Sequence, residues 1–166
     1  MALIDSHAHV IPDNWIYPGV DHGSALKPYC ILPLDVLAPL VIAPPILRPL
    51  GVFASAGTTA DQLAPYLDRL DLVAVEFPKF RDGRGFTLAR TLREKHGFKG
   101  DIRAIGHTLP DQFPALLRCG ITSVLLPPDH PAEQWQQRPS SGTRPTAGGP
   151  LLQRLLAGRT TADGKT

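Results

Sequence analysis

Three short apolar runs lie at residues 72–77, 101–106 and 121–126, and each has the length and β-branched content of a buried strand. An amphipathic stretch that predicts a helix, residues 86–96, separates the first run from the second and ends before Gly97. Strands that alternate with helices across short links favour a parallel sheet with right-handed crossovers. This part of the sequence therefore predicts a βαβαβ unit.

Capping residues predict two more helices. Thr59 and Gln62 fit a capping box, and Pro65 must bend or shorten the helix that they open. Thr108 and Asp111 form a similar N-cap pair for a helix between the second and third predicted strands. The regular pattern therefore extends back to about residue 58.

Prolines break up the first part of the chain, residues 1–57. Four prolines between positions 39 and 49 exclude a long helix there and permit only short strands and turns. Residues 51–54 predict one short strand. With one or two early strands of this kind, the sheet would have about four or five strands in all. We therefore predict an irregular, Pro-rich N-terminal part.

The chain of 166 residues predicts one α/β domain over residues 1–130, with residues 58–127 as its regular part. A small parallel sheet of this kind is Rossmann-like, whereas a full eightfold barrel needs roughly 200 residues or more. Residues 131–166 are rich in Pro, Gly, Ser and Thr, which predicts a largely disordered tail with one short apolar helix at 151–156.

Composition excludes several classes of function. A formal net charge of +2 is too small for a general binder of nucleic acids or membrane surfaces. The two cysteines, Cys30 and Cys119, are too few for a disulfide scaffold or a four-cysteine cluster. No leader peptide opens the sequence, and no uncharged apolar run reaches about 18 residues. We expect a cytoplasmic protein with neither a nucleic acid nor a membrane as its partner.

The segment from Glu76 to Phe86 is the main candidate for a binding site. It leaves the carboxyl end of the first predicted strand, the edge at which open α/β sheets bind ligands, and it opens a helix whose N-terminal dipole favours anions. Its basic loop, residues 79–85, carries three cations and two glycines that would permit close approach: Lys79, Arg81, Arg84, Gly83 and Gly85. Such a loop predicts a site for sulfate, phosphate or carboxylate.

Neighbouring residues are predicted to support the basic loop. Arg103, on the second strand, would line the same crevice and bind the anion as well. Glu76 and Asp82 would hold the arginines in position. His107 would act as a general acid or base near the crevice, or simply bond to backbone as a loop histidine. Asp111 would either support the site or cap its helix.

The basic loop also has a structural interpretation. Its DGRG sequence forms an ordinary tight turn in many folds, with surface arginines paired to nearby acids. Gly83 and Gly85 match only part of a dinucleotide-binding fingerprint, because Leu88 stands where the third glycine belongs. No acidic residue ends the second strand to hold a ribose. No cofactor is therefore evident, although the sequence leaves a flavin or a nicotinamide open.

A second motif, DSHAH, is similar to the first metal motif of the amidohydrolase superfamily, with His7 and His9 as its ligands. Such a site needs further ligands on later barrel strands. The positions of His22, His96 and His130 do not suit that role, and the chain is too short for the barrel. We expect no metal site and no metal-dependent hydrolase.

The stretch LDLVAVEFPKFRDGRGFTLARTLR, residues 70–93, resembles the bacterial family catalogued as domain of unknown function 934. Three shorter motifs extend this resemblance, GDIRAIG, DQ and RCGI, at residues 100–106, 111–112 and 118–121. The resemblance is specific over about residues 68–127 and weaker over residues 1–57.

The resemblance implies a protein of sulfur assimilation. Members of the family are typically encoded beside sulfite reductase, and some are labelled probable oxidoreductases of sulfite reduction. It transfers no catalytic residue, only the motif from Glu76 to Phe86 with Arg103, Asp111 and Gln112. Pro114 departs from the family pattern, inside a predicted helix.

Three functional hypotheses follow from the residues and the resemblance together. The first is an accessory protein of assimilatory sulfate or sulfite reduction that binds a small anion or nucleotide at the basic loop. The second is a non-catalytic protein partner of sulfite reductase or of another sulfur-assimilation enzyme. The third is an oxidoreductase that uses a borrowed cofactor.

Overall fold

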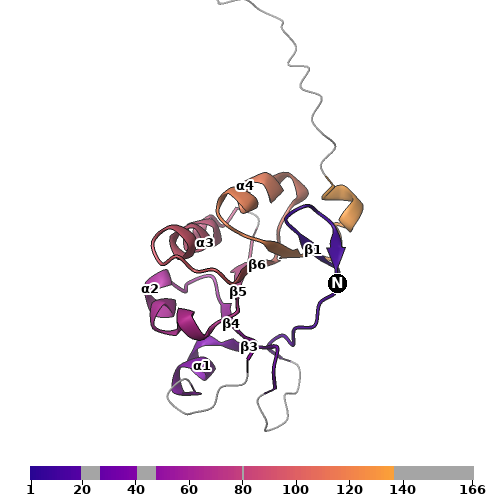
Figure 1. Cartoon of the computed structure of the whole chain (residues 1–166). Helices are drawn as coiled ribbons and strands as arrows, with labels where there is room; N and C mark the ends of the chain where they lie inside the picture. The colour runs from indigo at the N-terminus through magenta and orange to yellow at the C-terminus, as the bar shows by residue number, and fades with distance from the viewer. Residues whose placement is uncertain (20–26, 41–47, 80, 137–166) are drawn as a thin grey trace, which may run out of the picture. The chain divides into compact units, whose positions relative to one another are not determined.

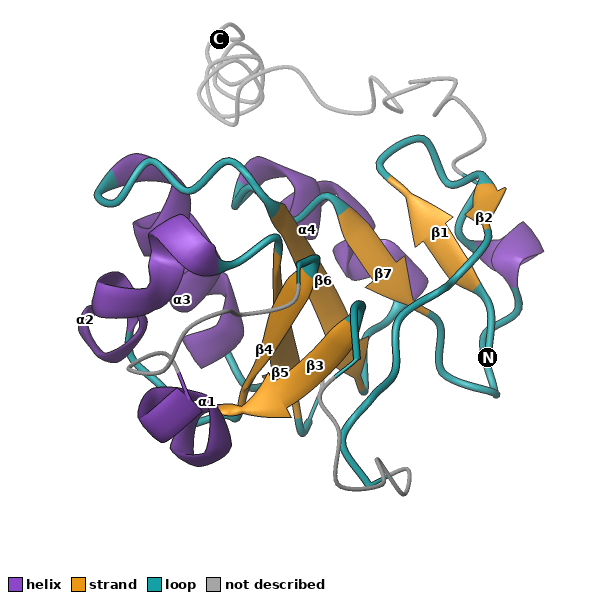
Figure 2. Ribbon diagram, turned by 60° about the horizontal axis from the view of Figure 1, so that its bottom comes forward, coloured by secondary structure: helices purple, strands orange, loops and turns teal. Residues whose placement is uncertain are grey.

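A seven-stranded sheet organises the part of the chain that the structure describes (Figures 1 and 2). The structure is a computed structural model, and it describes residues 1–19, 27–40, 48–79 and 81–136. The strands lie in the order β2-β1-β7-β6-β5-β4-β3. Their bounds are β1 Leu3–Asp5, β2 Val10–Ile11, β3 Cys30–Pro33, β4 Leu50–Ala54, β5 Leu72–Phe77, β6 Asp101–Gly106 and β7 Ser123–Leu125.

Five parallel strands, β3 to β7, follow one another in the sheet as they do in the sequence. Because each right-handed crossover moves one strand further in the same direction, the connecting helices lie on one face. Figure 1 shows the helices along one side of the strands. They are α1 Leu34–Leu40, α2 Ala60–Leu63, α3 Arg84–Glu94 and α4 Phe113–Arg118, with the short 3-10 helices η1 Ala64–Arg69, η2 Pro110–Gln112 and η3 Ala132–Gln134.

This architecture confirms the predicted α/β class, in a sheet that is not closed into a barrel. The order of the parallel strands does not reverse anywhere between β3 and β7. Rossmann sheets bind their cofactor where the order reverses. The described sheet therefore has no such crevice, and any ligand site must be built by the loops themselves.

The helical face of the sheet carries the larger apolar core. Alternate residues of β5 and β6, Val73, Val75, Ile102 and Ala104, point into it and are at most 1% exposed. Leu92 of α3 packs in the same cluster and is fully buried. Each buried valine, leucine or isoleucine of this kind stabilises the fold by about 1.5–3 kcal/mol.

The opposite face of the sheet is covered by the N-terminal arm, residues 12–18. Trp15 and Tyr17 pack on a second apolar cluster there, which includes Leu72 and Ala74 of β5. Gly51 of β4 makes room for the indole, since a Cβ atom at this glycine would lie 3.0 Å from a ring carbon of Trp15. The arm thus covers apolar side chains on this face of the sheet, as the helices do on the other face.

The arm crosses the sheet from one edge to the other. It leaves β2 at one edge and, at Ile16, forms a parallel bridge with Cys30 of β3 at the opposite edge. The Ile16 N–H donates to the carbonyl of Tyr29 at 2.8 Å, and the Ile31 N–H donates to the carbonyl of Ile16 at 2.9 Å. Backbone hydrogen bonds therefore hold the far end of the arm in register.

Arg103 of β6 holds the middle of the arm. Its guanidinium donates to Asp13 Oδ1 at 2.9 Å and to the Tyr17 hydroxyl at 2.7 Å on the arm. On the sheet it donates to Ser123 Oγ and to Asp101 Oδ2, each at 3.0 Å. Burial alone would lower the pKa of Arg103, but Tyr17 and the two carboxylates raise it overall. A buried charge is thus fully engaged by polar partners.

The strands predicted in the second half of the sequence are confirmed. The predicted strands at 72–77 and 101–106 coincide with β5 and β6, and the short one at 51–54 lies within β4. The third run, 121–126, is shortened to the three residues of β7. Continuous apolar runs identify strands that are buried on both faces.

The irregular N-terminal part is a correction. Residues 1–57 contain β1 to β4 and α1, so the sheet has seven strands rather than four or five. β1 and β2 pair as an antiparallel hairpin. The prolines restrict these elements without abolishing them, since Pro33 ends β3 and Pro39 lies inside a helix of only seven residues. Strands of two to four residues are too short to show a hydrophobic period.

The helix predicted between β6 and β7 divides into η2 and α4. Pro114 explains the division, because it lies in the first turn of α4, where no intrahelical N–H donor is needed. The Thr108 hydroxyl does not cap this helix, and among the described atoms it has no partner. The Gln112 side chain accepts a hydrogen bond from the N–H of Leu109 instead, at 3.1 Å.

The earlier helix forms as predicted and then tightens. Thr59 and Gln62 make a complete capping box at the start of α2. Pro65 lies in the first turn of η1, so the segment continues as a 3-10 helix after the four residues of α2. The proline thus shortens the α-helix, as the sequence indicates.

The folded unit extends past the predicted boundary at residue 130. Trp135 follows η3, is fully buried and packs edge-on against Phe113, with 5.8 Å between ring centroids. Residues up to Gln136 therefore belong to this unit. The rest of the predicted tail, including the helix at 151–156, lies outside the described residues.

We predict that Arg103→Ala destabilises the protein by about 3 kcal/mol, because it leaves two carboxylates without their buried cation and frees the arm. Urea unfolding followed by circular dichroism measures this change. Arg118→Ala, which removes an exposed arginine from α4, is the control and should change the free energy of unfolding by less than about 0.5 kcal/mol. Equal stability of the two variants would show that Arg103 does not hold the arm on the sheet.

Candidate ligand site at the carboxyl edge of the sheet

The loops that follow β3, β4 and β5 meet at one edge of the sheet, because these strands are parallel neighbours. The middle one, residues 55–59, connects β4 to α2, and we call it the threonine loop. The basic loop lies beside it, between β5 and α3. The carboxyl edge of parallel strands is where ligands bind in most α/β proteins.

Arg84 and Asp82 form the best-defined polar pair on the basic loop. Arg84 Nε donates to Asp82 Oδ1 at 2.9 Å, and Nη2 donates to Oδ2 at 2.6 Å. The same carboxylate accepts the backbone N–H of Arg84 at 3.1 Å, at the first residue of α3. These hydrogen bonds from Arg84 lower the pKa of Asp82 to about 2. The carboxylate therefore orients the guanidinium.

The two glycines of the basic loop do not take the predicted conformation. Gly83 has a φ of −79°, and Gly85 is a helical residue of α3. A Cβ atom at Gly85 would lie 2.6 Å from the ring of Phe77, whereas one at Gly83 would meet nothing within 4 Å. Gly85 is thus required for packing α3 on Phe77, and the expectation that it serves backbone approach to a ligand is wrong.

A pocket of about 360 Å³ lies between the threonine loop and α3, and we call it the arginine pocket. The polar residues among those that line it include Arg84, Thr58, Thr59, Thr87 and Thr91, and the Thr91 hydroxyl donates to the carbonyl of Thr87 at 2.8 Å. Asp61 closes another side, where it pairs with Lys95 at 3.0 Å. The hydrogen bond from Lys95 lowers the pKa of Asp61 and balances its charge.

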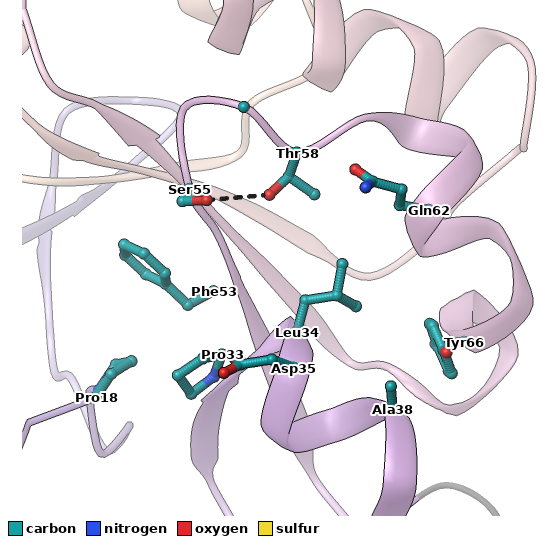
Figure 3. Close-up of a pocket in the computed structure, with 11 residues that line it drawn as sticks. Pro18, Pro33, Leu34, Asp35, Ala38, Phe53, Ser55, Thr58, Gln62 and Tyr66 are labelled. Carbon is teal, nitrogen blue, oxygen red and sulfur yellow. Dashed lines mark hydrogen bonds between the residues drawn. The ribbon is translucent and has the colours of Figure 1, made fainter.

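A larger pocket of about 710 Å³ lies on the other side of the threonine loop, around the ends of β3 and β4, and we call it the edge pocket (Figure 3). Two aromatic rings, Phe53 and Tyr66, contribute to its walls together with Leu34. Its polar residues are Asp35, Ser55, Thr58, Gln62 and Tyr66. Figure 3 shows Ser55 and Thr58 bonded to each other above the Phe53 ring, with 3.3 Å between their hydroxyl oxygens.

Glu76 supports the threonine loop rather than an arginine. Its Oε2 accepts the backbone N–H of Ala56 at 3.1 Å, so a β5 side chain holds the loop that follows β4. Lys79 and Arg81 are exposed on the basic loop, and neither belongs to the described lining of the two pockets. Of the predicted cations, only Arg84 therefore faces a pocket.

The structure corrects the prediction that Arg103 belongs to the anion site. It points to the face opposite the helices, where it binds the arm, and it cannot share a crevice with the basic loop. His107 is exposed beside β5, and its backbone N–H donates to the carbonyl of Phe77 at 2.7 Å. Asp111 and Gln112 belong to η2, and neither lines a described pocket.

The threonine loop and the edge pocket are the parts of the site that the sequence prediction missed. Four of the five loop residues are Ser, Gly or Thr, and they follow directly on a predicted strand. That position was a usable signal, because polar residues after a parallel strand lie at the ligand-binding edge. Phe53 and Asp35 carried no such signal, since their pocket requires the placement of β3 and α1.

No described group of three or more His, Cys, Asp or Glu residues could hold a metal ion. His7 and His9 stand exposed on the β1–β2 hairpin, with their rings stacked at 6.0 Å. Asp5 accepts the backbone N–H groups of both histidines, at 2.8 and 2.9 Å, which accounts for the DSHAH spacing as a turn. Among the residues that the structure describes, no helix is long and apolar enough to cross a bilayer.

The model of a bacterial protein family of unknown function, DUF934, matches residues 51–143, which is more than half of the chain. A search of curated proteins gives no match. The matched region contains the threonine loop, the basic loop and α3.

We predict that Gly85→Ala destabilises the protein by about 1–3 kcal/mol, since the added methyl group must displace the Phe77 ring or α3. Gly83→Ala is the matched control, because its methyl group meets open space at a φ that alanine adopts readily. Chemical denaturation should show a change of less than about 0.5 kcal/mol for the control. A destabilised Gly83→Ala would instead indicate that this glycine has the special role.

We predict that the Asp82 carboxyl titrates with a midpoint near pH 2, and that Arg84→Ala moves this midpoint up toward the ordinary value of 3.8. Because the folded-state pKa is depressed, the stabilisation is complete above about pH 4 and is lost as the pH falls through 2. Carboxyl carbon shifts in nuclear magnetic resonance measure both midpoints. A midpoint near 3.8 in the unaltered protein would show that the pair does not form in solution.

Proposed function

We propose a function from the premise that the chain belongs to the bacterial family of unknown function DUF934. In this proposal the protein binds a small anion beside Arg84, as an accessory protein of assimilatory sulfate or sulfite reduction. The observation that carries the anion site is the position of Arg84, which lines a pocket together with four threonines and is oriented by Asp82. The link to sulfur metabolism rests on the family resemblance alone.

The donor set of the arginine pocket suits a small oxyanion. A guanidinium has five N–H donors in a planar fork, and Asp82 takes up only part of them. Threonine hydroxyls on two sides can donate further hydrogen bonds, from Thr58 on the loop and Thr87 on α3. Because Asp82 already holds the guanidinium, an anion would not have to order a mobile side chain on binding.

The two carboxylates near the pocket limit the kind of anion that fits. Asp82 and Asp61 are each paired with a cation, Arg84 and Lys95, so their charges are offset at short range. A compact anion could bind the guanidinium N–H groups that Asp82 leaves open, whereas a large polyanion would also meet Asp61. Sulfate, sulfite and phosphate have the required size.

A non-catalytic partner of sulfite reductase is the second candidate. Its supporting observation is that Lys79 and Arg81 are exposed on the basic loop, outside the described lining of both pockets. Exposed cations at a loop tip suit an acidic patch on another protein, and such contacts increase association rates. An oxidoreductase with a borrowed cofactor would use this same edge of the sheet.

We predict that sulfate, sulfite or phosphate raises the thermal unfolding midpoint in a saturable way, and that Arg84→Ala abolishes this rise. A charge-assisted contact of this kind is worth about tenfold or more in affinity. Differential scanning fluorimetry over a range of anion concentrations measures the effect. Chloride at matched ionic strength separates specific binding from general screening.

Arg118→Ala serves as the control for the charge change, because this exposed arginine lies on α4, outside both pockets. It should keep the full anion response. An unchanged response in Arg84→Ala would refute the site. A flat response of the unaltered protein to all three anions, together with co-purification with sulfite reductase, would favour the partner function.

A further inference from the structure

The arginine pocket and the edge pocket share a wall. Gly57 and Thr58 of the threonine loop line both of them. The loop is therefore a narrow partition, with a guanidinium on one side and two aromatic rings on the other. A molecule that occupied both pockets would pass over this partition.

Gly57 leaves the top of the partition open. The residue is exposed, and a Cβ atom built on it would have no neighbour within 4 Å. Its φ lies outside the left-handed range, so the backbone there does not require a glycine. The open space above Gly57 thus leaves room for a ligand to reach from one pocket to the other.

The two pockets differ in charge and polarity. The arginine pocket offers Arg84 to an anion, whereas the charged residue of the edge pocket is Asp35, in the first turn of α1. An anionic group is disfavoured beside Asp35, and a group with hydroxyl or amino donors is favoured. A ligand that spans both pockets therefore has one anionic end and one uncharged end.

The walls of the edge pocket indicate what that uncharged end contains. Phe53 and Tyr66 lie at opposite ends of the pocket, with Leu34 between them, so either ring offers aromatic surface for a flat ring (Figure 3). Asp35, Ser55 and Gln62 offer the carboxylate, hydroxyl and amide groups that bind sugar hydroxyls. A ring attached to a polyhydroxylated linker and then to an anion matches this order.

We propose that the ligand is a nucleotide, with its 5′-phosphate beside Arg84 and its nucleoside in the edge pocket. The cavity of about 710 Å³ has the size of known small-molecule sites and accommodates a nucleoside. The inference deepens the proposed anion site and depends on it. It adds the class of ligand and assigns binding roles to Asp35, Phe53 and Gly57.

Isothermal titration calorimetry with adenosine 5′-monophosphate, inorganic phosphate and adenosine tests this assignment. The monophosphate should bind at least about tenfold more tightly than phosphate, since it makes the phosphate contacts and adds those of the nucleoside. Arg84→Ala should weaken both the monophosphate and phosphate. Adenosine, which lacks the anion, should bind more weakly than the monophosphate.

Gly57→Leu tests the path over the partition. A leucine side chain there should reduce the affinity for the monophosphate about tenfold more than the affinity for phosphate. Gly57→Ala is the control, because its single methyl group leaves most of the space open. The thermal midpoints of both variants without ligand should match that of the unaltered protein, since the position is open and unstrained.

Asp35→Asn tests the edge pocket independently at an exposed residue. It should weaken the monophosphate about tenfold, through loss of charge-assisted hydrogen bonds to the sugar, and leave phosphate unchanged. Equal affinity of the monophosphate and phosphate would overturn the nucleotide assignment and leave the anion site standing. Absence of any phosphate binding would overturn the proposed function itself. An equal loss of affinity for both ligands in Gly57→Leu would show that the ligand does not pass over the partition.

Discussion

The bonds that Arg103 makes across the sheet are the interaction on which the rest of the structure depends. A sheet whose parallel strands follow one another in sequence receives its helices on a single face. The other face must be covered by different means, and here an arm of seven residues crosses it from edge to edge. Arg103 joins this arm to β6 and β7, through Asp13 and Tyr17 on one side and Asp101 and Ser123 on the other. This attachment acts together with the backbone hydrogen bonds of Ile16 to hold Trp15 on Gly51, over the small apolar cluster.

The layers on the two faces of the sheet fix the positions of the loops at its carboxyl edge. Phe77 of β5 packs against Gly85, which sets how closely α3 approaches the sheet and hence where Arg84 stands. Glu76, one residue earlier, holds the threonine loop through the N–H of Ala56. Adjacent residues of one strand therefore position both walls of the arginine pocket, one through the helical face and one through the opposite face. Such second contacts are what keep binding groups in place in the absence of ligand.

The sequence allowed part of this to be predicted. β5 was identified correctly because a strand buried on both faces is nearly continuously apolar, and β6 because it follows a clear helix at a short distance. The capping box at Thr59 was correct because it is a local interaction. Arg103 was misplaced because its partners Tyr17 and Asp13 lie 86 and 90 positions away, so no local pattern reveals them. Gly85 was misread for a related reason, since a glycine that accommodates a ring and one that accommodates a ligand look alike in sequence. The edge pocket escaped prediction because β3 and α1 are too short to show a period.

The domain that sequence comparison defines differs from the domain that the fold defines, and the difference includes the arm. The family match begins at residue 51, after β1, β2, β3 and the whole arm. A protein fragment cut at that boundary would keep the recognisable βα units and lose the cover over Leu72 and Ala74. Its bare sheet face and unpaired β4 edge would then invite self-association. The unit that sequence comparison recognises is thus smaller than the folded unit, in which the arm covers this face of the sheet.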